Sequence, residues 1–450
     1  MPTCLLPPNT CSLSQQYLGM RGKTGTNKTS NKLSQQRNSK PVLLIFVSLL
    51  ILTLAIFLST RALPRLRSIA SHFRPSPPSS LSTSPLLSYS SRNTGATMSP
   101  YAKELEIAQL AVQRAAILTK RVFHEKAKGT VSKDDKSPVT IGDFGAQALI
   151  IAALKHNFPE DEIVAEEEAA ELREDANLRA TIWDLVKSTS LSDSGAEAAL
   201  GGAIKSEDEM LTFIDYGNSK GGAKGRIWAI DPIDGTKGFL RGGQYAVCLA
   251  LMVDGDVKVG VLGCPNLPID DAAPLSGGME SGQTDEGRGC LFSGVLGEGA
   301  VSRSLTTGTL ASSQKISMKA ITDIAAATFC ESVEPGHSSH GDQAQIAKKL
   351  GITNPSVRMD SQAKYASIAR GAGDIYLRLP VSATYQEKIW DHAAGDLIVR
   401  EAGGAVTDIH GKRLDFSIGR TLSSNKGVIA APAGSHAQVL TAVQEVIQVK

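Results

Sequence analysis

The chain has 450 residues, which is enough for one large domain or two of ordinary size. Its 47 basic and 45 acidic residues nearly balance, but residues 1–97 hold 11 of the basic residues and no acidic ones. Residues 98–450 therefore carry 36 basic and 45 acidic residues and are net acidic. This acidic body argues against binding of a nucleic-acid polymer, which requires a basic face.

The first 97 residues divide into three stretches by composition. Residues 1–40 are basic and polar and are expected to be disordered. Residues 41–60 are expected to form a transmembrane or targeting segment, because an apolar run over residues 42–60 is flanked by basic residues. Residues 61–97, rich in Pro and Ser, are expected to form a disordered linker. The sequence leaves three localisations open: a single-pass membrane anchor, an organelle, or the cytoplasm for a product that starts at Met98.

Two amphipathic helices are expected at the start of the acidic body. Ser99-Pro100 is a favourable helix start, and apolar residues recur at helical spacing over residues 105–122. A second helix with an apolar face is expected to follow Asp143. On local grounds Asp143 is equally well explained as part of a capping box with Thr140.

Two short apolar strands are then each followed by carboxylates. Residues 163–165 lead into three adjacent glutamates, which by themselves are typical of a solvated helix start. Residues 227–230 lead into Asp231, and we expect this strand to end at Asp231-Pro232 because proline cannot continue a ladder.

Asp231 and Asp234 lie three residues apart around a tight Asp-Gly turn. Such a turn can aim both carboxylates at one point, where two anions held close together require a cation. Carboxylate and carbonyl oxygens are hard ligands, which suit Mg²⁺ better than zinc. The alternative is an ordinary strand exit, in which Asp, Pro and Gly are common.

The rest of the chain favours an α/β class. The polar, Gly-rich residues 187–225 are predicted to be helix ends and a loop, and Asp254-Gly255 is predicted to be the turn of a β-hairpin. Strand and helix patterns alternate beyond residue 320. We therefore expect an α+β domain over residues 98–320 and an α/β domain over residues 321–450.

Polar residues of the second part have ordinary structural explanations as well as functional ones. His337 and His340 could be structural or a metal pair, and Ser361 could be a helix cap. Lys364 could be a solvated residue of a first helical turn, and Asp391 the N-cap of a helix that ends before residues 403–404.

Four segments, in this order, carry a family resemblance. They are Ser137-Pro-Val-Thr-Ile-Gly-Asp143, the strand before Glu166-Glu167, Asp231-Pro-Ile-Asp-Gly-Thr-Lys-Gly-Phe239 and Trp390-Asp-His-Ala-Ala-Gly395. Together they resemble the lithium-sensitive, Mg²⁺-dependent phosphomonoesterases, which include inositol monophosphatase. The His-Ser-Ser-His, Asp-Ser-Gln-x-Lys-Tyr and Tyr-Leu-Arg-Leu-Pro segments are similar to the 3′(2′),5′-bisphosphate nucleotidases of that superfamily.

This resemblance implies a layered αβαβα sandwich and a hydrolytic activity. The implied reaction converts adenosine 3′(2′),5′-bisphosphate to AMP and phosphate, with 3′-phosphoadenylyl sulfate as a further substrate and a link to sulfate assimilation. One alternative is an inositol polyphosphate 1-phosphatase or inositol monophosphatase. Another is an inactive, membrane-tethered nucleotide-binding protein.

The resemblance also implies site residues, two or three Mg²⁺ ions, a small-molecule substrate and a monomeric enzyme. Asp143 and Thr236 would orient the attacking water. The metal ligands would be Asp143, Glu166, Asp231, the carbonyl of Ile233, Asp234 and Asp391, with Glu167 as an alternative to Glu166. The nucleotide contacts would be Thr236, His337, Ser361, Lys364, Arg378 and Asp391.

Overall fold

The computed structural model describes residues 99–127, 138–278, 285–336, 338–382 and 384–447. All of them lie in one compact unit, which spans residues 93–450. The stretches predicted at residues 1–40, 41–60 and 61–97 lie outside the described residues. Within the residues that the structure describes, no helix combines the length and the apolar character needed to cross a membrane.

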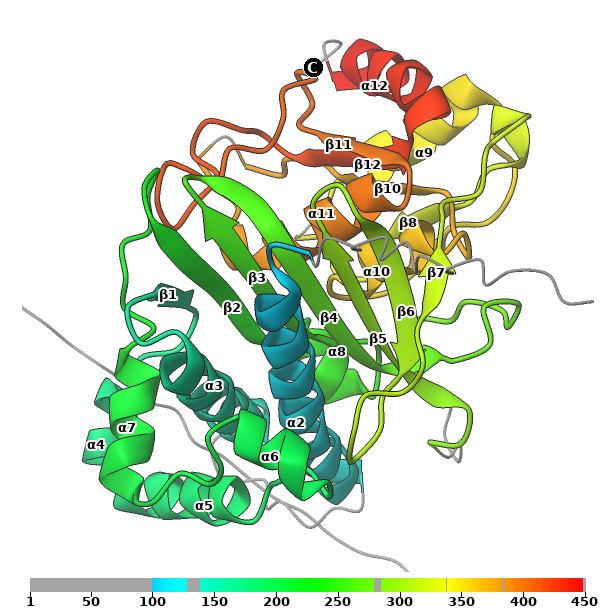
Figure 1. Cartoon of the computed structure of the whole chain (residues 1–450). Coiled ribbons are helices and arrows are strands. Elements are labelled where there is room, and N and C mark those ends of the chain that lie inside the picture. The colour runs from blue at the N-terminus through cyan, green and yellow to red at the C-terminus, as the bar shows by residue number, and fades with distance from the viewer. Residues whose placement is uncertain (1–98, 128–137, 279–284, 337, 383, 448–450) are drawn as a thin grey trace, which may run out of the picture. The chain divides into compact units, whose positions relative to one another are not determined.

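Two long helices form the first layer (Figure 1). They are α2 (Ala102–Ala127) and α3 (Pro138–Asn157), and both were predicted. Helix α3 begins at Pro138, so Asp143 lies in its second turn and not at its N-terminus. The interpretation of Asp143 as a member of a capping box is therefore wrong.

The second layer is a seven-stranded sheet whose strands follow in chain order. β1 is parallel to β2, and all later neighbours are antiparallel. The strands are β1 (Glu162–Ala165), β2 (Arg226–Asp234), β3 (Ala246–Val253), β4 (Asp256–Pro268), β5 (Arg288–Val295), β6 (Gly299–Ser304) and β7 (Gln314–Ile316). The predicted hairpin joins β3 and β4, and Asp254 and Gly255 both have positive φ, at 50° and 80°.

Strand β2 does not end at Asp231-Pro232 as predicted. It continues to Asp234, and its pairing with β3 shifts register between Asp231 and Asp234. Proline is tolerated at such a bulge because the ladder is already interrupted there. The irregularity therefore lies between the two carboxylates that the sequence singled out.

Both faces of this sheet are buried, as the alternation along β3 shows. Val247 and Leu249 pack in the core beneath α2 and α3, whereas Cys248 and Ala250 pack in the core on the opposite face. A strand that is buried on both faces has a continuous apolar sequence instead of an alternating one.

Four short helices connect β1 to β2. They are α4 (Ala170–Glu174), α5 (Ala176–Lys187), α6 (Ser194–Ala199) and α7 (Glu207–Asp215). The prediction of helix ends and a loop over residues 187–225 missed α6 and α7. Asp193 and Ser206 cap them by accepting bonds from Ala196 N and Glu209 N.

The remaining layers come from the C-terminal part of the chain. A five-stranded sheet has the order β11 (Gly404–Thr407), β12 (Val428–Pro432), β10 (Ile375–Arg378), β8 (Phe329–Glu331) and β9 (Val357–Arg358). Helices α10 (Ala363–Ala369) and α11 (Ala393–Glu401) pack between the two sheets. Helices α9 (His340–Leu350) and α12 (Ala433–Ile447) cover the outer face, so the predicted five-layer α/β architecture is confirmed (Figure 1).

Candidate active site

A pocket of about 310 Å³ opens where both sheets contribute strand ends. It adjoins the end of β2, the short helix α8 (Thr236–Arg241), the start of α10, the end of β10 and the 3₁₀ turn η2 (Ile389–Asp391). The residues that line it are Glu166, Asp231, Asp234, Gly235, Thr236, Lys237, Asp360, Ser361, Gln362, Lys364, Tyr365, Tyr376, Arg378, Tyr385 and Asp391.

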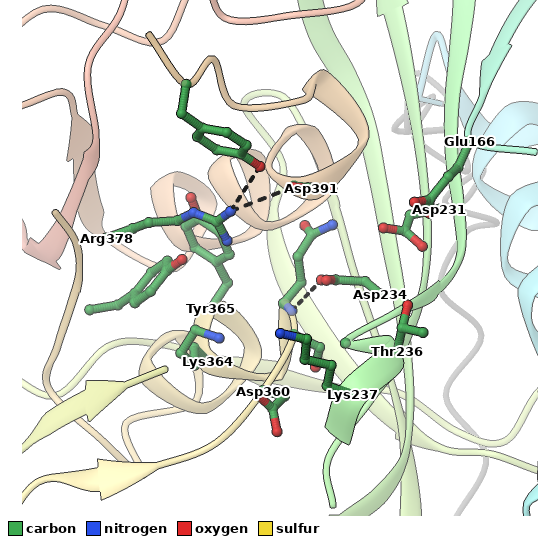
Figure 2. Close-up of a pocket in the computed structure, with 15 residues that line it drawn as sticks. Glu166, Asp231, Asp234, Thr236, Lys237, Asp360, Lys364, Tyr365, Arg378 and Asp391 are labelled. Atoms are coloured by element: carbon green, nitrogen blue, oxygen red, sulfur yellow. Dashed lines mark hydrogen bonds and ion pairs between the residues drawn. The ribbon is translucent and has the colours of Figure 1, made fainter. Parts of the chain in front are cut away.

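Most of the residues singled out from the sequence meet in this pocket. Those that line it are Glu166, Asp231, Asp234, Thr236, Ser361, Lys364, Arg378 and Asp391. Asp143 and Ile233 do not line the pocket and lie buried behind the acidic residues. His337 lies outside the described residues. Figure 2 shows Glu166, Asp231 and Asp234 on one side of the pocket, across from Lys364 and Arg378.

The end of β2 fixes the backbone around Asp234. Gly235 has a φ of 90° and is the N-cap of α8, and the Thr236 hydroxyl donates to the carbonyl of Ile233 at 3.5 Å. The backbone N–H of Gln362 donates to Asp234 Oδ2 at 2.5 Å. The second half of the chain therefore holds a carboxylate that the first half supplies.

The acidic side of the pocket carries charge that the protein does not compensate. Burial raises the pKa of Asp231 well above its ordinary value, and the charges of Glu166 and Asp234 raise it further. Burial and the charges of Glu167 and Glu166 do the same for the pKa of Asp143. One carboxylate oxygen each of Asp143 and Asp231 is buried without a hydrogen-bond partner. Buried anions in this arrangement need a cation or protons.

Glu166 and Glu167 are distinguished by their surroundings. Glu166 lines the pocket and keeps part of its surface open to solvent, yet burial by the pocket wall and the charge of Asp234 raise its pKa. The backbone of Glu167 is instead fixed from behind by Gln147 of α3, at 2.8 and 3.0 Å. Glu166 is thus the glutamate placed to reach a ligand in the pocket.

The cationic side is formed by Lys364 and Arg378. Lys364 is buried, which contradicts its interpretation as a solvated residue, and its Nζ donates to the Met359 carbonyl at 3.2 Å. Loss of water lowers the pKa of Lys364 to about 8. Arg378 forms ion pairs with Glu387 at 2.8 Å and with Asp391 at 3.8 Å.

Asp391 is not a helix cap. It lies in η2, and the N-cap of α11 is His392, whose side chain makes no capping bond. Burial raises the pKa of Asp391 well above its ordinary value, and the charge of Arg378 acts in the opposite direction. The carboxylate is therefore available to the pocket.

One other group of possible metal ligands lies beside the pocket. Within the part of the chain that the structure describes, Glu387, Asp391 and His392 are the three groups whose ligand atoms all lie within 4.8 Å of one another. The guanidinium of Arg378 already neutralises Glu387 and approaches Asp391. A cation placed between all three groups would be repelled by Arg378, so we assign Glu387 and His392 to holding Arg378, whereas Asp391 also faces the pocket.

Several pocket residues were missed at the sequence level. They are Lys237, Asp360, Gln362, Tyr365, Tyr376 and Tyr385. All except Tyr385 belong to segments that resemble the phosphatase family, but the resemblance assigned roles only to other residues of these segments. Their recognition required the three-dimensional convergence of α8, α10 and β10.

The five-layer fold and the acidic pocket are typical of α/β hydrolytic enzymes that bind an anionic ligand together with cations. The chain belongs to the inositol monophosphatase family, whose sequence profile matches residues 101–448.

Relatives that are named as nucleotidases are similar to most of this chain. A 3′(2′),5′-bisphosphate nucleotidase of Emericella nidulans is 67% identical over 349 residues, which cover 77% of this chain and 99% of the relative. The 3′(2′),5′-bisphosphate nucleotidase of Schizosaccharomyces pombe is 49% identical, over 76% of this chain and 95% of that one. Among solved structures, the IMPase of Thermotoga maritima is 19% identical with a TM-score of 0.47, covering 77% of this chain and 98% of that one.

Proposed function

We propose that the chain is a Mg²⁺-dependent phosphomonoesterase that hydrolyses adenosine 3′(2′),5′-bisphosphate to AMP and phosphate. The observation that carries this proposal is the charge of the pocket. The pocket is lined by five acidic side chains and only three basic ones. An anionic phosphate ester would be repelled by such a pocket unless cations entered with it. The names of the similar relatives support a bisphosphate nucleotide as the substrate.

The chain's own residues fit Mg²⁺ by their chemistry. All of the predicted ligands offer oxygen, and the buried, unpartnered oxygens of Asp143 and Asp231 are the groups that a cation would satisfy. The proposed ligands for two or three ions are Asp143, Glu166, Asp231, the Ile233 carbonyl, Asp234 and Asp391. When bound, Mg²⁺ lowers the pKa of water and neutralises charge on the leaving oxygen.

The protein's contribution is to place water and substrate. Thr236 is exposed to the pocket, and its bond to the Ile233 carbonyl fixes the direction of the hydroxyl that would orient the attacking water. Asp143, which lies behind the pocket carboxylates, would help Thr236 to orient this water. Lys364 and Arg378 would hold phosphate. His337 and Ser361 would contact the base and ribose.

Replacement of one buried carboxylate tests the metal assignment. Asp231→Asn should abolish phosphate release because it removes a ligand, whereas loss of an outer hydrogen-bond partner typically weakens metal binding or activity only about 10–100-fold. Asp256→Asn is the matched control, because Asp256 lies at the opposite end of the sheet and pairs with Lys258. A folded Asp231→Asn variant with near-normal turnover would overturn the assignment.

Four further properties are part of the proposal. Li⁺ should inhibit by replacing a weakly held Mg²⁺, 3′-phosphoadenylyl sulfate should also be a substrate, and the enzyme should be a monomer that acts in sulfate assimilation. Inhibition by LiCl, release of phosphate from the sulfated nucleotide, and the mass in solution test the inhibition, the second substrate and the monomeric state.

The inositol phosphatases remain the second candidate because the family takes its name from one. They would use the same acidic residues and differ only in the leaving group. An inactive binding protein is the third candidate, and Mg²⁺-dependent phosphate release from any substrate would eliminate it.

We also propose, from sequence alone, that residues 42–60 anchor the enzyme to a membrane. Replacing Ile51 and Leu54 by Lys in the full chain should release it from the membrane fraction, since charged residues are costly in the bilayer centre. Recovery of the unmodified chain in the cytoplasm or in an organelle lumen would contradict the anchor.

A further inference from the structure

Gln362 connects three parts of the active site from a buried position. Its backbone N–H donates to Asp234 Oδ2 at 2.5 Å. Its side-chain Nε2 donates to the Trp390 carbonyl at 2.8 Å, and its Oε1 accepts from Gly395 N at 2.9 Å. The same residue thus contacts the end of β2, the residue before Asp391, and the first turn of α11.

The bond to Gly395 replaces a missing helix cap. The first N–H groups of a helix have no partner within the helix, and a side chain at the N-cap usually satisfies one of them. The N-cap of α11 is His392, which makes no such bond, and Gly395 is the third residue of that helix. Gln362 therefore holds the start of α11, and with it the adjacent Asp391, at a fixed distance from Asp234.

Gln147 has the corresponding position behind Glu166. It lies on α3 and is fully buried. Its Nε2 donates to the Glu167 carbonyl at 2.8 Å and to the Ile214 carbonyl at 3.3 Å, and its Oε1 accepts from Glu167 N at 3.0 Å. Both backbone groups of the residue that follows Glu166 are thus held by one side chain.

We propose that Gln147 and Gln362 are positioning residues that hold the acidic side chains in the geometry that binds divalent cations. This inference rests on the metal site of the proposed function. Neither amide is placed as a ligand, because the side-chain oxygen and nitrogen of each already bond to backbone groups. The carboxylates repel one another, so their segments need an external restraint to stay together.

The test compares three buried glutamines in the full chain. Gln147→Met and Gln362→Met keep the side-chain length and remove the hydrogen bonds. Gln113→Met is the matched control, because Gln113 is also fully buried and bonds to Gly308 O and Thr306 N, which do not line the pocket. Calorimetric titration with Mn²⁺, together with urea unfolding without metal, separates metal affinity from stability.

We expect both site variants to bind Mn²⁺ about 10–100-fold more weakly, as is typical when an outer hydrogen-bond partner is lost. Gln113→Met should unfold at lower urea but bind Mn²⁺ as the wild type does. If a Met variant does not fold, Gln147→Asn or Gln362→Asn takes its place, because a shorter amide cannot span both bonds. Weaker Mn²⁺ binding by these Asn variants would support the positioning roles in the same way.

Two results would overturn the inference. One is wild-type Mn²⁺ affinity in folded site variants, and the other is an equal loss of affinity in Gln113→Met. A wild-type chain that binds no Mn²⁺ would remove the metal site itself, and the inference with it. A wild-type chain that binds Mn²⁺ but releases no phosphate from the nucleotide would contradict the proposed substrate and leave the positioning roles intact.

Discussion

Gly235 and Ser361 lie in close contact in the wall of the pocket, and both have positive φ angles, of 90° and 67°. A Cβ at Gly235 would lie 2.9 Å from the Ser361 Cβ and 3.2 Å from its backbone nitrogen. The absence of a side chain at Gly235 therefore allows the turn before α10 to approach the end of β2. The same turn directs the Gln362 N–H at Asp234.

Gly235→Ala should disturb both the fold and the pocket. We expect a loss of about 1–3 kcal/mol in the free energy of unfolding, because the alanine combines an unfavourable φ with a steric clash. Gly202→Ala is the control, since Gly202 has a φ of 76° but no atom within 4 Å of an added Cβ. Urea unfolding of both variants measures the difference, and equal losses would show that the contact with Ser361 has no effect.

The buried ion pair that holds Arg378 should contribute to stability. Glu387 pairs with Arg378 at 2.8 Å and with His392 at 3.3 Å, and its pKa is lowered to about 2, chiefly by the hydrogen bond from His392 and the charge of Arg378 acting against burial. Glu387→Gln removes the nearer of the two carboxylates that pair with Arg378, and breaking a buried ion pair costs about 3 kcal/mol.

The control for Glu387→Gln is an exposed ion pair of similar length. Lys349 and Glu445 lie 2.5 Å apart with about half of each side chain exposed, at 45% and 50%. Glu445→Gln should change the free energy of unfolding by less than about 0.5 kcal/mol. Similar effects of the two substitutions, measured by thermal unfolding, would contradict the importance of the buried pair.

The metal-free protein should lose stability as the pH rises. The pKa values of Asp143, Asp231 and Asp391 are raised well above the ordinary value, first of all by burial. A raised carboxyl pKa contributes stability that is complete below the unfolded value of about 3.9 and is lost as the pH rises through the folded value. Each such group can change the free energy of unfolding by at most about 1.4 kcal/mol per pH unit.

Comparison with Asp231→Asn isolates one of these groups. In EDTA, the stability of this variant relative to the wild type should increase between pH 5 and pH 8, because only the wild type ionises at this position. With Mg²⁺ the order should reverse, since a bound ion stabilises the folded state alone. A relative stability in EDTA that does not change with pH would contradict the raised pKa of Asp231.

Local chemistry singled out acidic residues that the structure brings together in the pocket. Asp231 and Asp234 come directly after the apolar residues 227–230, in the last part of β2, and this pattern depends only on neighbouring residues. The prediction failed at Pro232, because a bulge against β3 tolerates a proline that the strand alone would not. Helices α6 and α7 were missed because their caps lie within a polar, Gly-rich stretch.

Contacts between segments that are distant in the chain could not be predicted from the sequence. Gln362 bonds to Asp234 across 128 positions, and glutamine has no sequence signature for such a role. Ser361 takes a positive φ that is rare for serine, and the local pattern suggested only a cap. The predicted domain boundary near residue 320 and the roles given to individual site residues stay predictions.

The most direct measurement is phosphate release by the full chain from adenosine 3′,5′-bisphosphate, compared with inositol 1-phosphate and inositol 1,4-bisphosphate. AMP serves as the control because it lacks a 3′-phosphate, and each reaction is run with Mg²⁺ and with EDTA. We expect fast, Mg²⁺-dependent release from the bisphosphate nucleotide, with AMP as the product. Preference for an inositol phosphate, or release that persists in EDTA, would contradict the proposed function.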